Sequence, residues 1–392
     1  KVSRLNLKTD EFWNISPAII SLLERKLFQQ PKNPITLLKD FIVECMQNVI
    51  RDEGNSKFLI VSENFDSLLI AKDHVCRSRS DNYYINKDFC LRSHTSAHQY
   101  EFLKQGLERF LIIGDVYRRD QIDRTHFPSF HQIEGVCLYS SEQIFNGSNV
   151  NFLNHFLFFF LKKTSEKQEH HKIITAKAVT EKLKSALEVL CRHIFGEAIE
   201  MRWLDAYFPF THPSFELEIF YEGEWLEVLG CGVMEQKLLE SSNVFNKVGW
   251  AFGIGVERLA MVLYDIKDIR LFWTNDSGFL SQFVDKSPSD RFKVRPISVH
   301  PQLINDLSFW LPDTVMASQI TSDTYDIIRS LGGSLVEQVN LIDSFTNKLG
   351  RLSHTYRIVY RSNERALTKN EANIVHKAIE RKLVDIYNVE IR

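Results

Sequence analysis

The sequence predicts an α+β protein in which an antiparallel sheet flanked by helices precedes a smaller C-terminal domain. In residues 1–282 the strand-like runs follow one another without regular alternation of strand and helix, which favours antiparallel pairing. Residues 295–392 read strand, helix, strand, strand, helix, strand, which is the ferredoxin-like βαββαβ arrangement. We therefore expect one domain at 1–282 with an N-terminal helical extension, a linker at 283–294 and a ferredoxin-like domain at 295–392.

Two helices and several strands are expected in the larger domain. The first helix follows Asn33-Pro34, which can cap it, and its apolar residues recur at helical spacing. The second runs from about Lys172 and ends at Gly196. The strand-like runs are residues 67–71, 110–118, 130–138, 215–221 and 224–229.

The C-terminal domain carries its own start and stop signals. Its first helix covers about residues 323–331 and closes at Gly332-Gly333. Its second helix begins with a capping box, Thr368 with Glu371 three residues later. The polar stretch 282–295 before this domain, with one proline and two serines, is typical of a linker.

The composition limits the possible partners. With 44% hydrophobic and 25% charged residues and a net charge of −2, the chain resembles a soluble globular protein, so any contact with nucleic acid needs a local basic patch. The six cysteines form no CxxC pair, which argues against a zinc ribbon or a disulfide framework and suits a reducing compartment. The apolar run 156–161 is far shorter than the roughly 18 residues that span a bilayer.

The most informative segment is residues 114–135, GDVYRRDQIDRTHFPSFHQIEG, which reads as strand, polar loop and strand. Side chains alternate along a strand, so the second strand places Phe130, Gln132 and Glu134 on one face. Arg118 stands on the first strand as a cation. An aromatic ring, an arginine and a carboxylate together suit a nucleotide and an ammonium group. An isolated hairpin of this kind is more often ordinary, with a solvated polar face, but three further segments point to the same kind of ligand.

A second segment, GWAFGIGVERLAMVLYDI from Gly249, reads as strand, glycine turn and helix. It lacks the third glycine of a dinucleotide-binding loop, because Arg258 stands there, and no βαβ unit precedes it. Arg258 falls in the first turn of the helix, where the helix dipole and the guanidinium both favour a phosphate.

A third segment, SHTSAHQ at residues 93–99, places His94, Ser96 and Gln99 on a turn that enters a helix. These are compact hydrogen-bonding groups. His94 and His98 have the i, i+4 spacing of metal ligands, but no carboxylate or third histidine is spaced to complete a zinc site.

A fourth segment covers residues 207–232. Phe208 and Phe210 flank a proline and could wall an apolar slot, although two phenylalanines are more often core packing. Glu227 lies on a strand that leads to Gly230-Cys-Gly232, where small residues leave room for a ligand.

These motifs resemble those of class II aminoacyl-tRNA synthetases. VYRRDQ with FHQIEG is similar to the second class-defining motif and GIGVERLAM to the third, and neither HIGH nor KMSKS is present. From about Asn64 onward the chain resembles the single-chain phenylalanyl-tRNA synthetases of mitochondria. The resemblance implies ATP-dependent attachment of phenylalanine to tRNA(Phe) through a phenylalanyl-adenylate, with Mg²⁺ as the metal.

The resemblance also implies roles for individual residues. Arg118 and Arg258 are the implied catalytic residues, contacting the α- and γ-phosphates, and Phe130 stacks on adenine. The implied ATP-binding residues are Arg118, Asp120, His126, Phe130 and Arg258; the phenylalanine-binding residues are His94, Ser96, Gln99, Gln132, Glu134, Phe208 and Phe210; Glu227 is the Mg²⁺ contact. Five basic residues on and around one strand of the C-terminal domain are the expected tRNA contacts: Lys348, Arg351, Arg357, Arg361 and Arg365.

Two departures from the family pattern affect the expectations. Asp120 stands where class II enzymes often carry glutamate. Residues 54–64 lack the proline of the first class motif, which builds the dimer interface in most class II enzymes, so we expect a monomer. Because the chain begins at Lys1, we expect a leader to have been removed and the protein to reside in the mitochondrial matrix.

Two other functions are each consistent with part of the sequence. A non-catalytic, synthetase-like RNA-binding protein should have damaged residues among Arg118, Glu134 and Arg258, and all three are intact. An adenylate-forming amide ligase on the same catalytic fold has no use for an anticodon-type C-terminal module.

Overall fold

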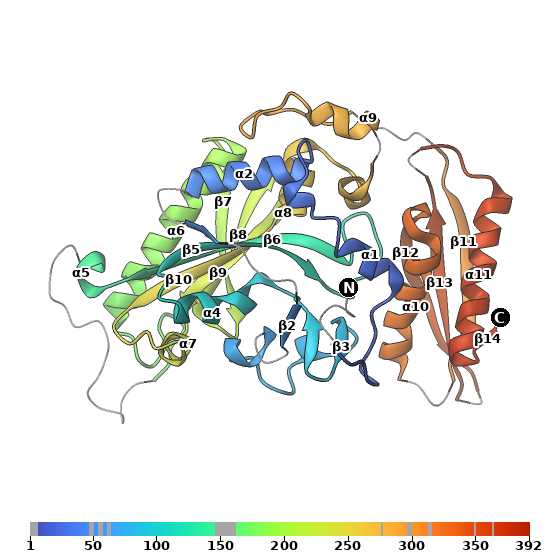
Figure 1. The fold of residues 1–392 in the computed structure, drawn as a ribbon, viewed down its shortest axis with the longest axis horizontal. Coiled ribbons are helices and arrows are strands. Elements are labelled where there is room, and N and C mark those ends of the chain that lie inside the picture. The colour runs from blue at the N-terminus through green and yellow to red at the C-terminus, as the bar shows by residue number, and fades with distance from the viewer. Residues whose placement is uncertain are drawn as a thin grey trace.

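The computed structural model describes residues 7–46, 51–53, 58–60, 64–145, 162–275, 277–295, 300–312, 316–348, 350–362 and 364–392. The apolar run 156–161 lies outside the described residues, as does most of the segment 54–64. Two bodies stand side by side, with the C-terminal domain (orange to red) next to the larger domain (Figure 1).

A seven-stranded sheet forms the centre of the larger domain, with strand order β1-β5-β6-β10-β9-β8-β7. All its neighbouring strands pair antiparallel except β1 with β5, which run parallel, so the prediction of an antiparallel sheet holds for all but this edge. The strands are β1 (Arg51–Glu53), β5 (Arg109–Tyr117), β6 (Ser129–Tyr139), β7 (Glu200–Phe208), β8 (Thr211–Tyr221), β9 (Glu224–Met234) and β10 (Val248–Gly255). A three-stranded sheet contains β2 (Phe58–Ile60), β3 (Tyr84–Asn86) and β4 (Phe89–Leu91).

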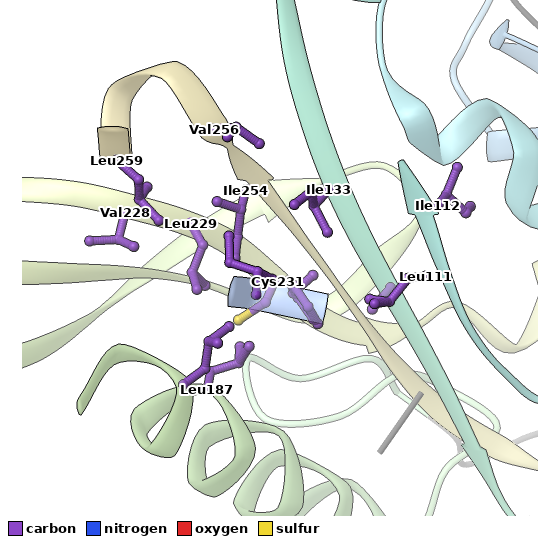
Figure 2. Packing of buried hydrophobic residues seen from close by; sticks show 14 of the residues in the cluster. Leu111, Ile112, Ile133, Leu187, Val228, Leu229, Cys231, Ile254, Val256 and Leu259 are labelled. Carbon is purple, nitrogen blue, oxygen red and sulfur yellow. The ribbon is translucent and has the colours of Figure 1, made fainter. Parts of the chain in front are cut away.

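Helices cover the sheet and bury its apolar residues. Figure 2 shows Leu187 of α6 beside Cys231 of β9 and Ile254 of β10, all within one buried cluster. Asn33 caps α2 by accepting a bond from the Ile35 N–H at 3.0 Å, as predicted. The helices of this domain are α1 (Pro17–Leu22), α2 (Pro34–Met46), α4 (Gln99–Lys104), α5 (Ser141–Ile144), α6 (Ile173–Phe195), α7 (Gln236–Ser241), α8 (Val256–Tyr264) and α9 (Ser277–Leu280).

The C-terminal domain has the predicted ferredoxin-like order. Its sheet runs β12-β13-β11-β14, and α10 and α11 pack against each other on one side of it (Figure 1). Thr368 and Glu371 form the predicted capping box of α11, whereas α10 begins at Ala317, earlier than predicted. The elements are β11 (Leu303–Trp310), α10 (Ala317–Gly332), β12 (Val336–Thr346), β13 (Leu352–Tyr360), α11 (Lys369–Tyr387) and β14 (Glu390–Ile391).

Two sequence predictions need correction. Residues 67–71 are not a strand: a 3-10 turn covers Asp66–Leu68 and ends at Leu69, whose φ of 60° is incompatible with an extended strand. The polar stretch 282–295, predicted to be a linker, also packs against the larger domain. Phe283 and Val294 are buried in the core of the larger domain, and the Val294 N–H donates to the Tyr264 carbonyl at 2.7 Å.

The two domains meet at the loop between β5 and β6. Arg119 lies between Asp323 and Asp326 of α10, bonding Asp326 at 2.9 Å, and Tyr83 donates to Asp326. Ile122 of the loop is buried in the apolar cluster of the C-terminal domain. The loop that carries Arg118 therefore also holds the second domain in place.

A buried carboxylate completes this junction and gives a first prediction. The Glu337 side chain is fully buried and pairs with Arg124 of the loop and, at 2.8 Å, with Arg361. Replacing Glu337 with alanine leaves both arginines without this partner, so we expect a loss on the order of 3 kcal/mol of stability. Thermal unfolding measures it, with the exposed Glu364→Ala as control. Equal midpoints for the two variants would show that the junction contributes little.

Candidate functional site

A cavity of about 750 Å³ opens above β6, β9 and β10. Every site residue predicted in the larger domain lines it, although these residues come from segments far apart in the sequence. They are His94, Ser96, Gln99, Arg118, Asp120, His126, Phe130, Gln132, Glu134, Phe208, Phe210, Glu227 and Arg258.

Strand pairing explains why these side chains converge. Gln132 and Glu134 of β6 lie opposite Gly255 and Gly253 of β10. A Cβ added at either glycine would meet no atom within 4 Å, so β10 leaves open space on the floor of the cavity. α8 follows directly, and Arg258 lies in its first turn as predicted.

One end of the cavity carries the cations. The Arg118 Nε donates to the Ser93 carbonyl at 2.8 Å, and its guanidinium lies 5.1 Å from the centre of the Phe130 ring. Arg258 pairs with Glu227 at 3.1 Å, and both side chains are about half exposed. This arrangement leaves two arginines and an aromatic face open to a ligand.

The β5–β6 loop adds a histidine to this end of the cavity. The His126 Nδ1 lies 2.7 Å from Asp123 Oδ2, and this bond raises the pKa of His126 above its usual value. The charge of Arg258 acts on His126 in the opposite direction, which shows that the two groups are close. Asp120 lines the same part of the cavity. A polyanion would find complementary charge here.

The opposite part of the cavity is organised around Glu134. Its carboxylate accepts bonds from Ser96 at 2.5 Å, Thr95 at 3.0 Å and Gln99 at 2.5 Å. Burial raises the pKa of Glu134 to about 7, although these three bonds lower it. Gln132 joins the same network by accepting the Thr95 N–H at 3.2 Å. Glu134 thus holds the segment 95–99 in place as well as lining the cavity.

Two buried polar side chains beside Glu134 retain bonding capacity. The Gln99 Oε1 and both ring nitrogens of His94 are buried without a close hydrogen-bond partner among the described residues. Burial, and then the charge of Arg118, lowers the pKa of His94 to about 3, so its imidazole is neutral at pH 7. A buried polar atom without a partner is costly, so these atoms are suited to a polar ligand.

The predicted aromatic slot is present. The rings of Phe208 and Phe210 stack with centres 6.2 Å apart, and Phe210 also stacks on His94 at 6.4 Å. The prediction that Gly230 and Gly232 leave room for a ligand was wrong, because side chains and backbone of the protein itself fill the space beside them. A Cβ on Gly230 would lie 2.7 Å from the Phe208 ring, and one on Gly232 would meet Thr211 and the Pro213 carbonyl at 2.6 Å.

Glu257, next to Arg258, is a site residue that the sequence did not predict. Its carboxylate accepts the His131 N–H at 2.8 Å and lies 2.5 Å from the His131 Nδ1. Both side chains are almost fully buried. This pair links the start of α8 to β6 and so fixes Arg258 relative to Phe130. The glutamate directly before Arg258 in GIGVERL was the only local sign of this pair. Its partner, His131, lies 126 residues away in the sequence.

The zinc alternative finds no support in the described part of the chain. The His98 Nε2 is engaged by Arg92, whose Nη1 lies 2.9 Å away. No group of three or more metal-ligating side chains gathers among the described residues. All six cysteines are free thiols, and no helix in the described part of the chain is long and apolar enough to cross a membrane.

The predicted basic residues of the C-terminal domain do not form one patch. They extend along β13, whose nine residues span on the order of 27 Å. Arg351 pairs with Glu390, Arg357 with Asp306, Arg361 with Glu337 and Arg365 with Glu371, at 2.6 to 2.8 Å. Arg361 is only 21% exposed at the domain junction, so in this arrangement of the domains it is not a free surface cation.

Two known families match successive parts of the chain. Residues 20–171 and 167–283 match the family described as tRNA synthetases class II core domain (F). Residues 298–392 match the ferredoxin-fold anticodon binding domain. Together the matches cover most of the chain.

Curated relatives resemble it over nearly its whole length. A mitochondrial phenylalanine–tRNA ligase of Mus musculus is 46% identical over 394 residues, covering 98% of this chain and 86% of the relative. The probable mitochondrial phenylalanine–tRNA ligase of Drosophila melanogaster is 43% identical, covering 100% and 92%. The mitochondrial phenylalanine–tRNA ligase of Saccharomyces cerevisiae is 37% identical, covering 100% and 95%.

Proposed function

Because the chain belongs to the class II phenylalanine–tRNA ligases of the mitochondrial, single-chain type, we propose that its cavity makes phenylalanyl-adenylate from phenylalanine and ATP and then transfers the phenylalanyl group to tRNA(Phe). The observation that carries the proposal is the convergence of all thirteen predicted residues on one cavity, with cations at one end and an aromatic slot at the other. The alternative of a non-catalytic RNA-binding protein is not supported by the named relatives.

The cationic end is the proposed ATP site. Arg118 would contact the α-phosphate, Arg258 and His126 the terminal phosphates, and Phe130 would stack on adenine. Since Arg118 already lies over Phe130, the base and the α-phosphate would bind next to each other. The phenylalanine carboxylate attacks the α-phosphorus, pyrophosphate leaves, and the arginines stabilise the negative charge that develops on the phosphoryl oxygens. No covalent enzyme intermediate is required.

The proposed phenylalanine site lies between Glu134 and the two phenylalanines. The ammonium group would bind the free Gln99 Oε1 and the carboxylate of Glu134, with neutral His94 beside it. The ring of the substrate would lie against Phe208 and Phe210, where ring contacts add to apolar burial. Ser96 and Gln132 hold this polar wall through their bonds to Glu134 and Thr95.

The residues near Arg258 fit a magnesium ion. Burial and the neighbouring charges of Glu227 and Glu218 raise the pKa of Glu216, so the negative charges on β8 and β9 repel one another. A divalent cation relieves that repulsion, and carboxylate oxygens are the ligands Mg²⁺ prefers. We assign Glu227, with Glu216 next to it, to this role. The ion would supply charge neutralisation on the phosphates.

The second step requires tRNA to reach the cavity. A ribose hydroxyl at the tRNA 3′ end, expected to be the 2′-OH, attacks the adenylate carbonyl and releases AMP. Exposed basic residues of the C-terminal domain, Lys348, Arg351, Arg357 and Arg365, remain proposed tRNA contacts. By analogy with the relatives we place the protein in mitochondria, more specifically the matrix, and propose that it acts as a monomer.

The aromatic slot gives a second prediction. The cavity that contains the slot is also lined by the apolar residues Ala251, Phe252 and Cys231, so we expect the hydroxyl of tyrosine to lose hydrogen bonds at a cost of roughly 1–3 kcal/mol. This is modest discrimination, so we expect measurable activation of tyrosine, weaker than that of phenylalanine. Radiolabelled ATP with each amino acid, followed by chromatography of the aminoacyl-AMP formed on the enzyme, tests it. No tyrosyl-AMP at millimolar tyrosine would contradict the prediction, and no phenylalanyl-AMP would contradict the proposed function.

A further inference from the structure

The outer face of the C-terminal sheet carries a compact group of two aromatic rings and two arginines. α10 and α11 bury Leu307 and Phe309 of β11, so the alternating Trp310 points to the opposite face. Trp310 lies opposite Ser353 of β13, which in turn lies opposite Phe345 of β12. The two rings meet across the small serine, with centres 6.3 Å apart. They leave Ser353 only 1% exposed, whereas Phe345 itself is 44% exposed.

Both arginines lie against these rings. The Arg351 guanidinium carbon is 5.1 Å from the Trp310 ring centre, and that of Arg392 is 5.4 Å from Trp310 and 5.8 Å from Phe345. In the next cross-strand row the hydroxyls of Ser308 and Thr355 are 2.8 Å apart. The group therefore offers ring faces, two positive charges and hydroxyls within a few residues of one another.

This combination matches the chemistry of an unpaired nucleotide. A base can stack on an aromatic face or on a guanidinium plane, and its phosphate can pair with arginine. An open four-stranded βαββαβ sheet with aromatic residues on its face is also how a common class of RNA-binding module holds single-stranded bases. The carboxylate of Glu390, 2.7 Å from Arg351, would be exchanged for a phosphate of the RNA.

We propose that Trp310 and Phe345, flanked by Arg351 and Arg392, form a stacking site for an unpaired base of the bound tRNA. This inference rests on the proposed function, and it deepens the matched family's description as an anticodon-binding domain by assigning the contact to aromatic stacking at one end of the sheet. It differs from the basic strip along β13 predicted from the sequence, of which only Arg351 belongs to this group.

The test measures aminoacylation of a tRNA(Phe) transcript by the full chain, beside amino-acid-dependent pyrophosphate exchange without tRNA. Trp310→Ala and Phe345→Ala are expected to raise the KM for tRNA by roughly 10- to 100-fold each and to leave exchange unchanged. Trp310→Phe keeps a ring and should restore most of the affinity. Ile304→Ala is the matched control. Ile304 lies on the same strand as Trp310, at the opposite end of that strand, and its side chain is 56% exposed.

Salt dependence separates stacking from charge. Arg351→Ala and Arg392→Ala are each expected to lower the slope of log affinity against log salt by about one, whereas Trp310→Ala leaves the slope unchanged. Wild-type KM values for both aromatic variants would overturn the inference. A loss of exchange together with the rise in KM would also overturn it, since the group would then be a structural element. A wild-type chain without phenylalanine-dependent exchange would instead refute the proposed function.

Discussion

Replacing Arg118 with alanine is expected to lower phenylalanine-dependent pyrophosphate exchange by at least about a hundredfold, since one such group contributes roughly 3 kcal/mol to stabilising a transition state. Arg118 is held in the cavity by its bond to the Ser93 carbonyl and by its contact with Phe130. Its removal takes away the cation nearest the proposed position of the α-phosphate. The loss should appear in kcat more than in the KM for ATP, because charge on the phosphoryl group increases in the transition state.

The neighbouring arginine supplies a matched control. Arg119 points to the other side of the loop, where it lies between Asp323 and Asp326 of the C-terminal domain. Arg119→Lys keeps a positive charge there, so exchange should stay within about twofold of the wild-type value while thermal stability falls. If Arg118→Ala retained wild-type exchange, or if both variants lost it equally, the assignment of Arg118 would be wrong.

The second large effect is expected at Glu134. In Glu134→Gln an amide replaces the carboxylate that accepts bonds from Ser96, Thr95 and Gln99, so at least one donor is left without its acceptor. A hydrogen bond to a charged group contributes about 1.5–3 kcal/mol, and we expect the KM for phenylalanine to rise roughly 10- to 100-fold. The control is Glu101→Gln on α4, whose carboxylate is 58% exposed and lies close to the same turn.

Glu134 also predicts a specific pH dependence of stability. Burial raises its pKa to about 7 in the folded protein from the ordinary value of 4.5, so folding favours the protonated acid. Its contribution to stability is fully present below pH 4.5 and is lost as the pH rises to about 7. The loss is on the order of 3 kcal/mol. Unfolding measured at pH 5 and pH 8 should show a smaller decrease for Glu134→Gln than for the wild type, and parallel decreases would contradict this origin.

The catalytic site could be predicted from the sequence because its residues lie in short local patterns. These patterns also determine the face of the strand or helix on which each side chain lies. Phe130, Gln132 and Glu134 alternate along β6 and therefore share the face that lines the cavity. The predicted glycine turn is wrong, because Gly253 and Gly255 are the last residues of β10, but the helix that follows at once still sets Arg258 in the first turn of α8. In both cases the distance along the chain is short enough for backbone geometry alone to place the side chain.

Contacts between distant segments could not be predicted in this way. No local pattern assigns a role to Arg119, and only the docked position of α10, some 200 residues later, shows that it serves the domain junction. The space beside Gly230 was predicted to hold a ligand because the sequence does not show that β7 pairs with β8 and β8 with β9, which brings Phe208 of β7 against Gly230. The arginines on and beside β13 could be identified in the sequence, but the carboxylates that pair with them lie on other elements.

The group at Trp310 illustrates the same limit. Trp310 lies on β11 and Phe345 on β12, whereas Arg351 lies in the β12–β13 hairpin and Arg392 follows β14, and no short motif connects them. Only the register of β11, β13 and β12 places the two rings on either side of Ser353. Sequence patterns thus located the chemistry of the first reaction step, whereas the surface proposed for tRNA required the folded sheet.

The central claim is that one cavity selects phenylalanine and activates it with ATP. Pyrophosphate–ATP exchange by the wild-type chain, run with each of the twenty amino acids and without tRNA, tests this claim most directly. We predict strong exchange with phenylalanine, a weak signal with tyrosine and none above background with the others. Strong exchange with an amino acid that lacks an aromatic ring, or no exchange with any amino acid, would contradict it.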